Sequence, residues 1–372
     1  MGYVKKEGST WYYAVDLGKD ANGKRRRKKE RGFKTKREAE IALANIVSEL
    51  SKGTYVEPTK VLYKDFLYHW LESKRNSLRS QTHYNYVMIA KKHVLPELGS
   101  LTVQQINSPT LQRFVDELCN KGLTGAYIKK IIDVVNSSLK KAMRLGFIAQ
   151  NPMELVDRPR IGKKEMRVWD KIEVEKFLTA AYPERFYIAF LLAITTGMRQ
   201  GEILGLRWQD IDFENRTLCV RQTLSHDGKT ILSEAKTKSS IRPIYLPDET
   251  LEALRKHRLL VKQEKLKSGG EYKDQDLVVC TTVGTPVCPR NLNRTWYRLL
   301  NQSGVTQIRF HDLRHTHATL LLQKGIHIKV VAERLGHSNT RITLDTYSHV
   351  LPTMQEEAAK AISDILFKEN CM

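Results

Sequence analysis

One stretch near the carboxyl end of the chain, Arg309–Val350, determines how the rest is interpreted: RFHDLRHTHATLLLQKGIHIKVVAERLGHSNTRITLDTYSHV. At its start His311 and Arg314 are three residues apart, so both side chains share one face of a helix. Leu335-Gly336-His337 predicts a helix that ends at a glycine, with a histidine directly after it. Tyr347 follows ten residues later. Cationic, imidazole and phenol side chains in this order suit chemistry on a phosphodiester, and Tyr347 is the obvious nucleophile among them.

The composition indicates a polyanionic partner. The 372 residues include 62 Lys+Arg and 41 Asp+Glu, a formal net charge of +21. Such an excess favours nucleic acid or an anionic membrane surface. The longest apolar run, Ile188–Ile194, is too short to span a bilayer, so no membrane partner is expected. The five cysteines form no CxxC pair, which argues against a zinc ribbon or a disulfide framework and for a reducing, cytoplasmic compartment.

The pattern along the chain predicts three domains, over residues 1–58, 59–160 and 165–372. The stretches between them, Lys52–Thr59 (KGTYVEPT) and Arg158–Lys164 (RPRIGKK), contain the glycine and proline typical of linkers. The expected fold class is multidomain α+β. It comprises a small module of β-sheet and one helix, an all-α domain, and a mainly α domain with a small antiparallel sheet.

The first domain is predicted to be a DNA-binding module. Strands are expected at Trp11–Leu17 and Lys24–Glu30, with a third near Arg31–Lys34, followed by a helix Lys36–Lys52 that is capped by Thr35. Residues 1–40 contain 13 Lys+Arg and 6 Asp+Glu. The alternative is a solvated charge run without a fold. The predicted phosphate contacts are the basic residues of the second strand: Lys24, Arg25, Arg26, Arg27, Lys28 and Lys29.

The second domain shows helical patterns at about Tyr63–Lys74, Gln81–Val94, Pro109–Lys121 and Thr124–Leu145. Its lysine pairs are as consistent with solvated helix faces as with phosphate contacts. The sequence alone leaves both alternatives open.

In the third domain, TTGMRQGEILGLRW predicts a helix that ends at Gly197 and another that begins at Arg199, with Glu202 three residues on. A purely structural ion pair between Arg199 and Glu202 would explain these two residues equally well. A metal site formed by His311, His315 and His317 is disfavoured, because Arg314 lies between them and would oppose a cation.

Strands are expected at Thr217–Thr223, Thr230–Glu234 and Arg242–Leu246. Lys236 lies in the turn before the last of these strands, where a lysine is usually just solvated. A helix is expected at Arg290–Leu300.

Taken together, the motifs of the third domain resemble those of the tyrosine recombinases, the family of phage and transposon integrases. The similarity extends over about 185 residues and involves five motifs in the family's order: TGMRQGEILGLRW, EAKTKSSIRPIYLP, FHDLRHTHAT, RLGHS and LDTYSHV. The helical domain resembles the family's core-binding domain. The first module resembles the arm-binding domain of integrases from mobile elements.

The resemblance implies a role for each matching residue. Tyr347 would attack the scissile phosphate and form a 3′-phosphotyrosyl bond, while Arg199 and Arg314 would bind the non-bridging oxygens. Two histidines, His311 and His337, would add hydrogen bonds, and one of them would accept the tyrosine proton. Lys236 would protonate the leaving 5′-oxygen. In addition, Glu202 would orient Arg199, and neither a metal nor another cofactor would be required.

The implied partners are double-stranded DNA attachment sites, three further copies of the chain in a tetramer, and an excisionase or a DNA-bending protein. Strands would be exchanged through a Holliday junction in a bacterial host cell. The apolar stripe of Met354–Phe367 would pack on its own domain or on another protomer. Two alternatives are a type IB topoisomerase, which shares the chemistry, and a non-catalytic DNA-binding regulator, which would have gaps among the matching positions.

Overall fold

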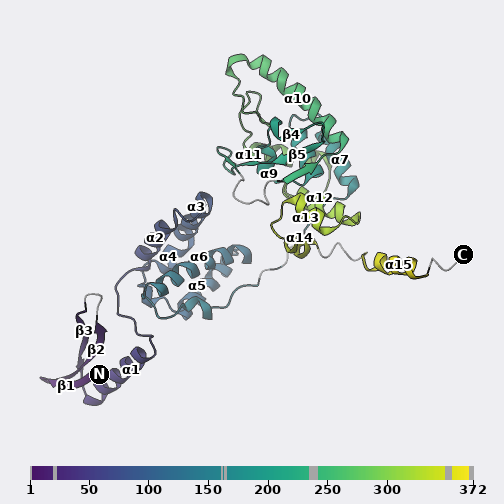
Figure 1. The fold of residues 1–372 in the computed structure, drawn as a ribbon. Helices are drawn as coiled ribbons and strands as arrows, with labels where there is room; N and C mark the ends of the chain where they lie inside the picture. Colours follow the sequence, from purple (N-terminus) through teal and green to yellow (C-terminus); the bar gives the residue numbers. More distant parts are fainter. Residues whose placement is uncertain are drawn as a thin grey trace. The chain divides into compact units, whose positions relative to one another are not determined.

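A computed structural model describes residues 2–19, 23–160, 162, 166–233, 242–347 and 354–367. The chain forms two compact units, Met1–Lys164 and Glu165–Met372 (Figure 1). Among the described helices, none combines the length and the apolar character that crossing a membrane requires. The fold is multidomain α+β, as the sequence predicts.

The amino-terminal unit begins with an antiparallel sheet of order β1-β2-β3, packed on one helix (Figure 1). Its elements are β1 (Gly2–Glu7), β2 (Thr10–Lys19), β3 (Arg25–Phe33) and α1 (Lys36–Ser51). The sheet and α1 enclose a small core that contains Tyr13, Val15 and Ile46. The predicted capping of α1 by Thr35 is confirmed. The prediction of a separate strand at Arg31–Lys34 is wrong, because residues 25–33 form one continuous strand, β3. The sheet has its additional strand, β1, at the start of the chain.

The helices that follow have a second core. They are α2 (Tyr63–Lys74), α3 (Ser80–Ile89), α4 (Leu95–Leu98), α5 (Ser108–Asn120) and α6 (Gly125–Arg144), with short helical turns η1 (Ala90–Val94), η2 (Val103–Gln105) and η3 (Pro152–Leu155). The apolar stripe of α6 is buried along its length, and it packs with Tyr63, Trp70 and Phe114 from α2 and α5. The predicted helix Gln81–Val94 has the α form only as far as Ile89, since η1 is a π-helical turn.

The carboxy-terminal unit is mainly helical, with two small antiparallel sheets. Its helices are α7 (Lys171–Ala181), α8 (Tyr187–Thr196), α9 (Gln200–Leu204), α10 (Asp248–Ser268), α11 (Pro289–Ser303), α12 (Asp312–Gln323), α13 (Ile328–Leu335), α14 (Thr340–Tyr347) and α15 (Met354–Phe367), with turns η4 (Trp208–Asp210) and η5 (Gly269–Glu271). The sheets are β4-β5-β8 (Ile211–Asp212, Thr217–Val220, Arg242–Tyr245) and β6-β7 (Gln222–Leu224, Ile231–Ser233). The core contains an aromatic cluster of Trp169, Phe177, Phe190 and Trp296.

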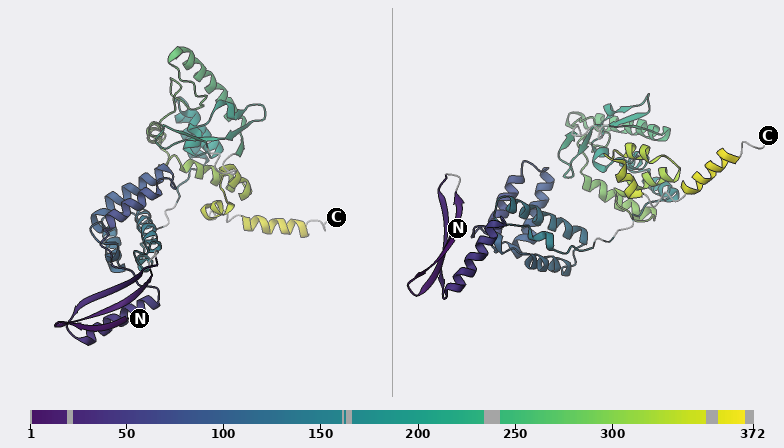
Figure 2. Two further views of the ribbon diagram at one scale, coloured as in Figure 1. Left: turned by 60° about the vertical axis from the view of Figure 1, so that its left-hand side comes forward. Right: turned by 60° about the horizontal axis from the view of Figure 1, so that its bottom comes forward.

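A glycine brings three helices of this unit together. Gly197 ends α8 with φ +67°, a left-handed conformation that favours glycine. A Cβ atom at Gly197 would lie 2.7 Å from both His317 of α12 and Leu335 of α13. The end of α8 therefore lies directly against α12 and α13, and α13 in turn contacts α14. The last of these segments, coloured yellow-green to yellow, lie together in both views of Figure 2. These helix ends contain most of the residues that the sequence singles out.

Candidate active site

The first cation of the site, Arg199, is positioned by the start of α9. It is the N-cap residue of this helix, and its backbone N–H and its Nη1 atom donate to Glu202, at 2.9 and 2.6 Å. The Glu202 side chain is fully buried, whereas the Arg199 side chain is 43% exposed. The carboxylate is thus fixed in the protein, and the guanidinium that it holds remains accessible to a ligand.

The second cation, Arg314, lies on α12 and is buried. Its Nη1 atom donates to the carbonyl oxygen of Gly197 at 2.8 Å. Its Nη2 atom is buried and has no hydrogen-bond partner among the described residues. Burial, followed by the charge of Arg199, lowers the pKa of Arg314 to about 10, so the guanidinium still has its proton at neutral pH. A buried cationic donor without a hydrogen-bond partner destabilises the folded state unless a bound anion accepts its hydrogen bond.

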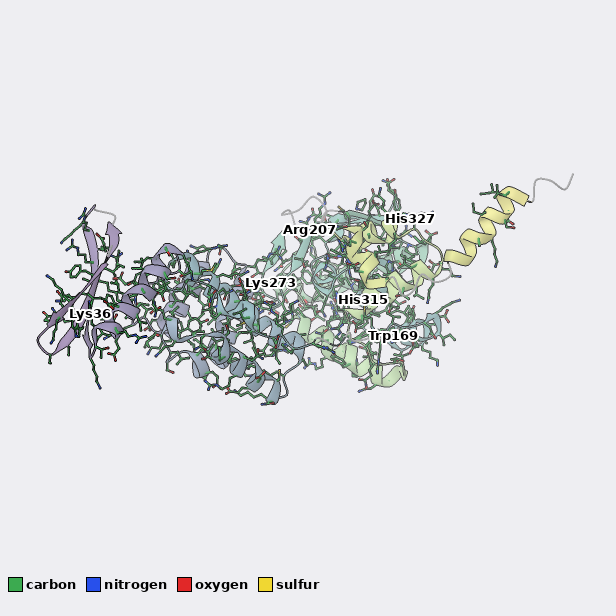
Figure 3. The ribbon with its side chains drawn as sticks, turned by 90° about the horizontal axis from the view of Figure 1, so that it is seen from below. Lys36, Trp169, Arg207, Lys273, His315 and His327 are labelled. Atoms are coloured by element: carbon green, nitrogen blue, oxygen red, sulfur yellow. The ribbon has the colours of Figure 1, made fainter. Side chains whose placement is uncertain are left out.

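Tyr347 is the last residue of α14, and its side chain is buried, with 1% of its surface exposed. Its hydroxyl lies 2.7 Å from Nδ1 of His315 on α12 (His315 is labelled in Figure 3). Burial raises the pKa of Tyr347 to about 12, although the charge of Arg314 acts in the opposite direction. Burial also lowers the pKa of His315 to about 4. Both partners are therefore neutral, and the phenol is held protonated.

The histidines of this region have different surroundings. Nδ1 of His337, just after α13, is 2.8 Å from Oγ1 of Thr343 on α14. Burial, and then the charges of Arg314, Arg199 and Arg242, lower the pKa of His337 to about 4. His311 precedes α12 and is exposed, with its ring 5.4 Å from that of His315.

His317 contacts residues of α8 and α13. Its Nδ1 bonds the carbonyl oxygen of Ile194 at 2.7 Å, and its Nε2 accepts from Nε of Arg334 at 3.2 Å. His317 and His315 thus each have a hydrogen-bond partner within the protein. Within the described ranges no group of three or more His, Cys, Asp or Glu side chains could hold a metal ion.

The structure thus brings together Arg199, Glu202, His311, Arg314, His337 and Tyr347. Arg314 interacts electrostatically with Arg199, Glu202 and Tyr347, and His337 with both arginines. The sequence-predicted Lys236 lies outside the described residues.

Sequence reasoning missed two residues of this site. Arg242, the first residue of β8, is buried and bonds Glu202 at 2.9 Å. His315 bonds the predicted nucleophile. For His315 the sequence offers one signal, namely its position directly after Arg314 in the motif FHDLRHTHAT.

The basic strand β3 distributes its charges over two faces of the sheet. Directly paired residues of antiparallel strands point to the same face. Lys28 is paired with the buried Val15 and so lies on the face covered by α1, whereas Arg27 is paired with Asp16 and Lys29 with Ala14.

Neighbouring contacts agree with this division. On the helix-covered face Arg26 forms an ion pair with Glu57, and Lys28 lies over the ring of Tyr55. On the open face the ammonium group of Lys29 lies 3.7 Å from the ring centre of Tyr12. Among the predicted phosphate contacts, Arg27 and Lys29 therefore occupy the face of the sheet away from α1.

Comparison with known proteins gives the class. Residues 167–354 match the phage integrase family, residues 3–50 an arm DNA-binding domain, and residues 62–119 the N-terminal SAM-like domain of phage integrases. The chain belongs to the phage integrase family of tyrosine recombinases, as its motifs indicated, and is an enzyme of that type.

Two relatives match nearly the full length of the chain. A tyrosine recombinase XerC-like protein of Caldanaerobacter subterraneus subsp. tengcongensis is 33% identical over 98% of each chain. The ICEBs1 integrase of Bacillus subtilis is 26% identical, over 98% of this chain and all of the relative.

Two solved structures share the fold. The Tn1549 transposon integrase, in complex with a circular intermediate DNA, has a TM-score of 0.68 at 20% identity, covering 81% of this chain and 100% of that one. A lambda integrase dimer bound to a COC′ core site has a TM-score of 0.58 at 19% identity, covering 94% of each chain.

Proposed function

We propose that this chain is the site-specific recombinase, or integrase, of a mobile element, and that it cleaves and rejoins double-stranded DNA through Tyr347. The observation that supports this most directly is the electrostatic interaction of the buried Tyr347 phenol with the buried guanidinium of Arg314, whose Nη2 atom has no partner in the part of the chain that the structure describes. A scissile phosphate would supply the missing acceptor. The names of the relatives, which include integrases of a transposon and of ICEBs1, agree with a mobile-element role.

The reaction follows from the positions of the charges. The oxygen of Tyr347 attacks phosphorus, the bond to the 5′-oxygen breaks, and a 3′-phosphotyrosyl bond retains the energy for religation. Arg199 and Arg314 form planar, charge-assisted hydrogen bonds to the non-bridging oxygens. One of His311 and His337 accepts the phenol proton, and the departing 5′-oxygen takes a proton from Lys236. Because the stabilising cations are side chains, we propose that no cofactor takes part.

The rest of the chain would hold the DNA. We assign residues 1–58 to arm-type sites, residues 59–160 to the core site, and residues 165–372 to catalysis. The open face of the first sheet, with Arg27 and Lys29, can lie in a major groove, while the basic side chains contact phosphates.

Exchange of two strand pairs requires four active sites, so the working form is a homotetramer on a Holliday junction. An excisionase or a DNA-bending protein would set direction. Because the substrate is DNA of a bacterial host, we propose that the protein acts in the bacterial cytoplasm.

Trapping on a nicked suicide substrate tests the nucleophile. The wild-type chain should form a covalent adduct that survives denaturing electrophoresis, and Tyr347→Phe should form none while it binds DNA normally. A covalent band with Tyr347→Phe would show that another residue is the nucleophile. A plasmid with two attachment sites then separates recombination from simple relaxation of supercoils, which is what a type IB topoisomerase would produce.

A further inference from the structure

Arg242 is a buried arginine that contacts two parts of the site at once. Its Nη2 atom donates to Oε2 of Glu202 at 2.9 Å, and its Nε atom donates to the carbonyl oxygen of Arg334 at 2.8 Å. The side chain is 7% exposed. Since Arg334 is in the last turn of α13, one guanidinium joins the start of α9 to the end of α13.

The end of α13 is shaped around this guanidinium. Gly336 ends α13 in the left-handed conformation, with φ +69°. A Cβ atom at this position would lie 2.6 Å from Nη1 of Arg242. A glycine is therefore required here both by the backbone conformation and by the close approach of Arg242. The next residue is His337, so the position of Arg242 also constrains the backbone conformation that places His337.

Arg242 acts on Glu202 through charge as well as through geometry. Burial alone would raise the pKa of Glu202, but the charge and the hydrogen bond of Arg242, followed by those of Arg199, hold it below its ordinary value. Among the described residues, the cationic groups that interact with Glu202 are Arg199 at the start of α9, Arg242 on β8 and Arg314 on α12. Arg199 is half exposed, so the buried Arg242 is the more constant counter-ion.

We propose that Arg242 is a positioning residue for strand cleavage, which fixes the Glu202 carboxylate that aims Arg199 and fixes the turn that presents His337. This inference rests on the proposed roles of Arg199 and His337. Arg242 is also the first residue of β8, so the same contacts anchor the start of this strand. Arg242 itself does not need to touch DNA.

The test compares Arg242→Gln and Arg242→Lys with Arg185→Gln. Arg185 is a matched control, because it forms a partly buried, bidentate pair with Glu264 in the same unit but away from the site. The measurements are the dissociation constant for a core-site duplex, and the single-turnover rate of adduct formation at saturating DNA.

Arg242→Gln should slow cleavage by about 100-fold, the size of effect expected when a reacting group is misplaced by about 1 Å, while the dissociation constant changes little. Arg242→Lys should slow cleavage less than Arg242→Gln does, because lysine keeps the positive charge. It should still be slower than the wild type, because lysine lacks the planar guanidinium that bonds two partners at once. Arg185→Gln should lower the melting temperature without slowing cleavage. Where Arg242→Gln does not fold, Arg242→Lys carries the same comparison.

Two further readouts separate positioning from general stability. The rate for Arg242→Gln should rise with pH over a range in which the wild-type rate is flat, because Glu202 would ionise only at higher pH. In the background of Glu202→Gln, adding Arg242→Gln should slow cleavage by a smaller factor than it does in the wild type, because the part of its effect that acts through the carboxylate is already lost.

A folded Arg242→Gln that cleaves at the wild-type rate would overturn this inference and leave the proposed function intact. An adduct that persists with Tyr347→Phe would instead overturn the proposed nucleophile.

Discussion

Replacing His315 by alanine tests what its hydrogen bond to Tyr347 does. The tyrosine is 1% exposed, so its oxygen cannot reach a DNA phosphate from the position that it occupies. The bond of 2.7 Å to His315 helps to hold it there. We expect this arrangement to be a resting state, from which α14 must move before cleavage.

The size of the effect follows from the burial of the phenol. Without His315, the hydroxyl would be buried without that partner, which costs about 1–3 kcal/mol. A cost of this size shifts the equilibrium between the resting and the released tyrosine by about 5- to 150-fold towards release. His315→Gln is the conservative control, because an amide can still bond the hydroxyl.

The assay has two parts. In DNA-free protein, hydrogen exchange of the α14 amides should be faster in His315→Ala than in the wild type, and close to the wild type in His315→Gln. On a suicide substrate, His315→Ala should form the adduct at least as fast as the wild type. A fall in the cleavage rate of about 100-fold or more, with unchanged exchange in α14, would refute this reasoning and identify His315 as the proton acceptor of the reaction.

Four further predictions concern stability, cofactors and assembly. The pKa values of His315, His317 and His337 are each lowered to about 4, so the folded state binds fewer protons than the unfolded state between about pH 4 and 6.5. The stability that they contribute is present above about pH 6.5 and is lost as the pH falls towards 4, which thermal melts in a pH series will show. Cleavage should persist in excess EDTA, and a strict magnesium requirement for cleavage itself would contradict the proposed mechanism. Removal of residues 1–58 should leave adduct formation on a short core site and abolish recombination of a full attachment site. It should also reduce the salt dependence of binding by about 0.9 in log–log slope for each phosphate that the shortened chain no longer neutralises. In gel-shift assays, Ile362→Glu on α15, where the isoleucine is 56% exposed, should weaken synapsis more than the binding of one site, and a collapse of monomer stability would instead place the stripe in the domain's own core.

The local features of the site could be predicted from the sequence because they depend on neighbours. The end of α8 at Gly197 and the pairing of Arg199 with Glu202 each involve residues within one helical turn. Glycine conformation and N-terminal capping are therefore enough to anticipate them. The end of α13 at Gly336 is of the same kind.

The missed residues depend on contacts that the sequence does not record. Arg242 meets Glu202 across 40 positions, and His315 meets Tyr347 across 32. Only the packing of β8 and of α14 against the other helices brings them together. The long helix α10 was missed for a different reason, since it buries only a thin set of side chains, including Leu251 and Leu254, within an otherwise charged segment.

We propose that the contacts of Arg314 and Tyr347 restrict cleavage to bound DNA. In the free chain, Arg314 has a buried donor without a described partner, and Tyr347 has a pKa of about 12 beside a neutral imidazole. A phosphate placed against Arg314 would complete that donor. It would also offset the positive charge that, after burial, lowers the pKa of His337. The same ligand that satisfies the arginine would thus make His337, one of the two proposed proton acceptors, more basic. We therefore expect Tyr347, which is buried and protonated in the free chain, to react only after DNA has bound and α14 has moved.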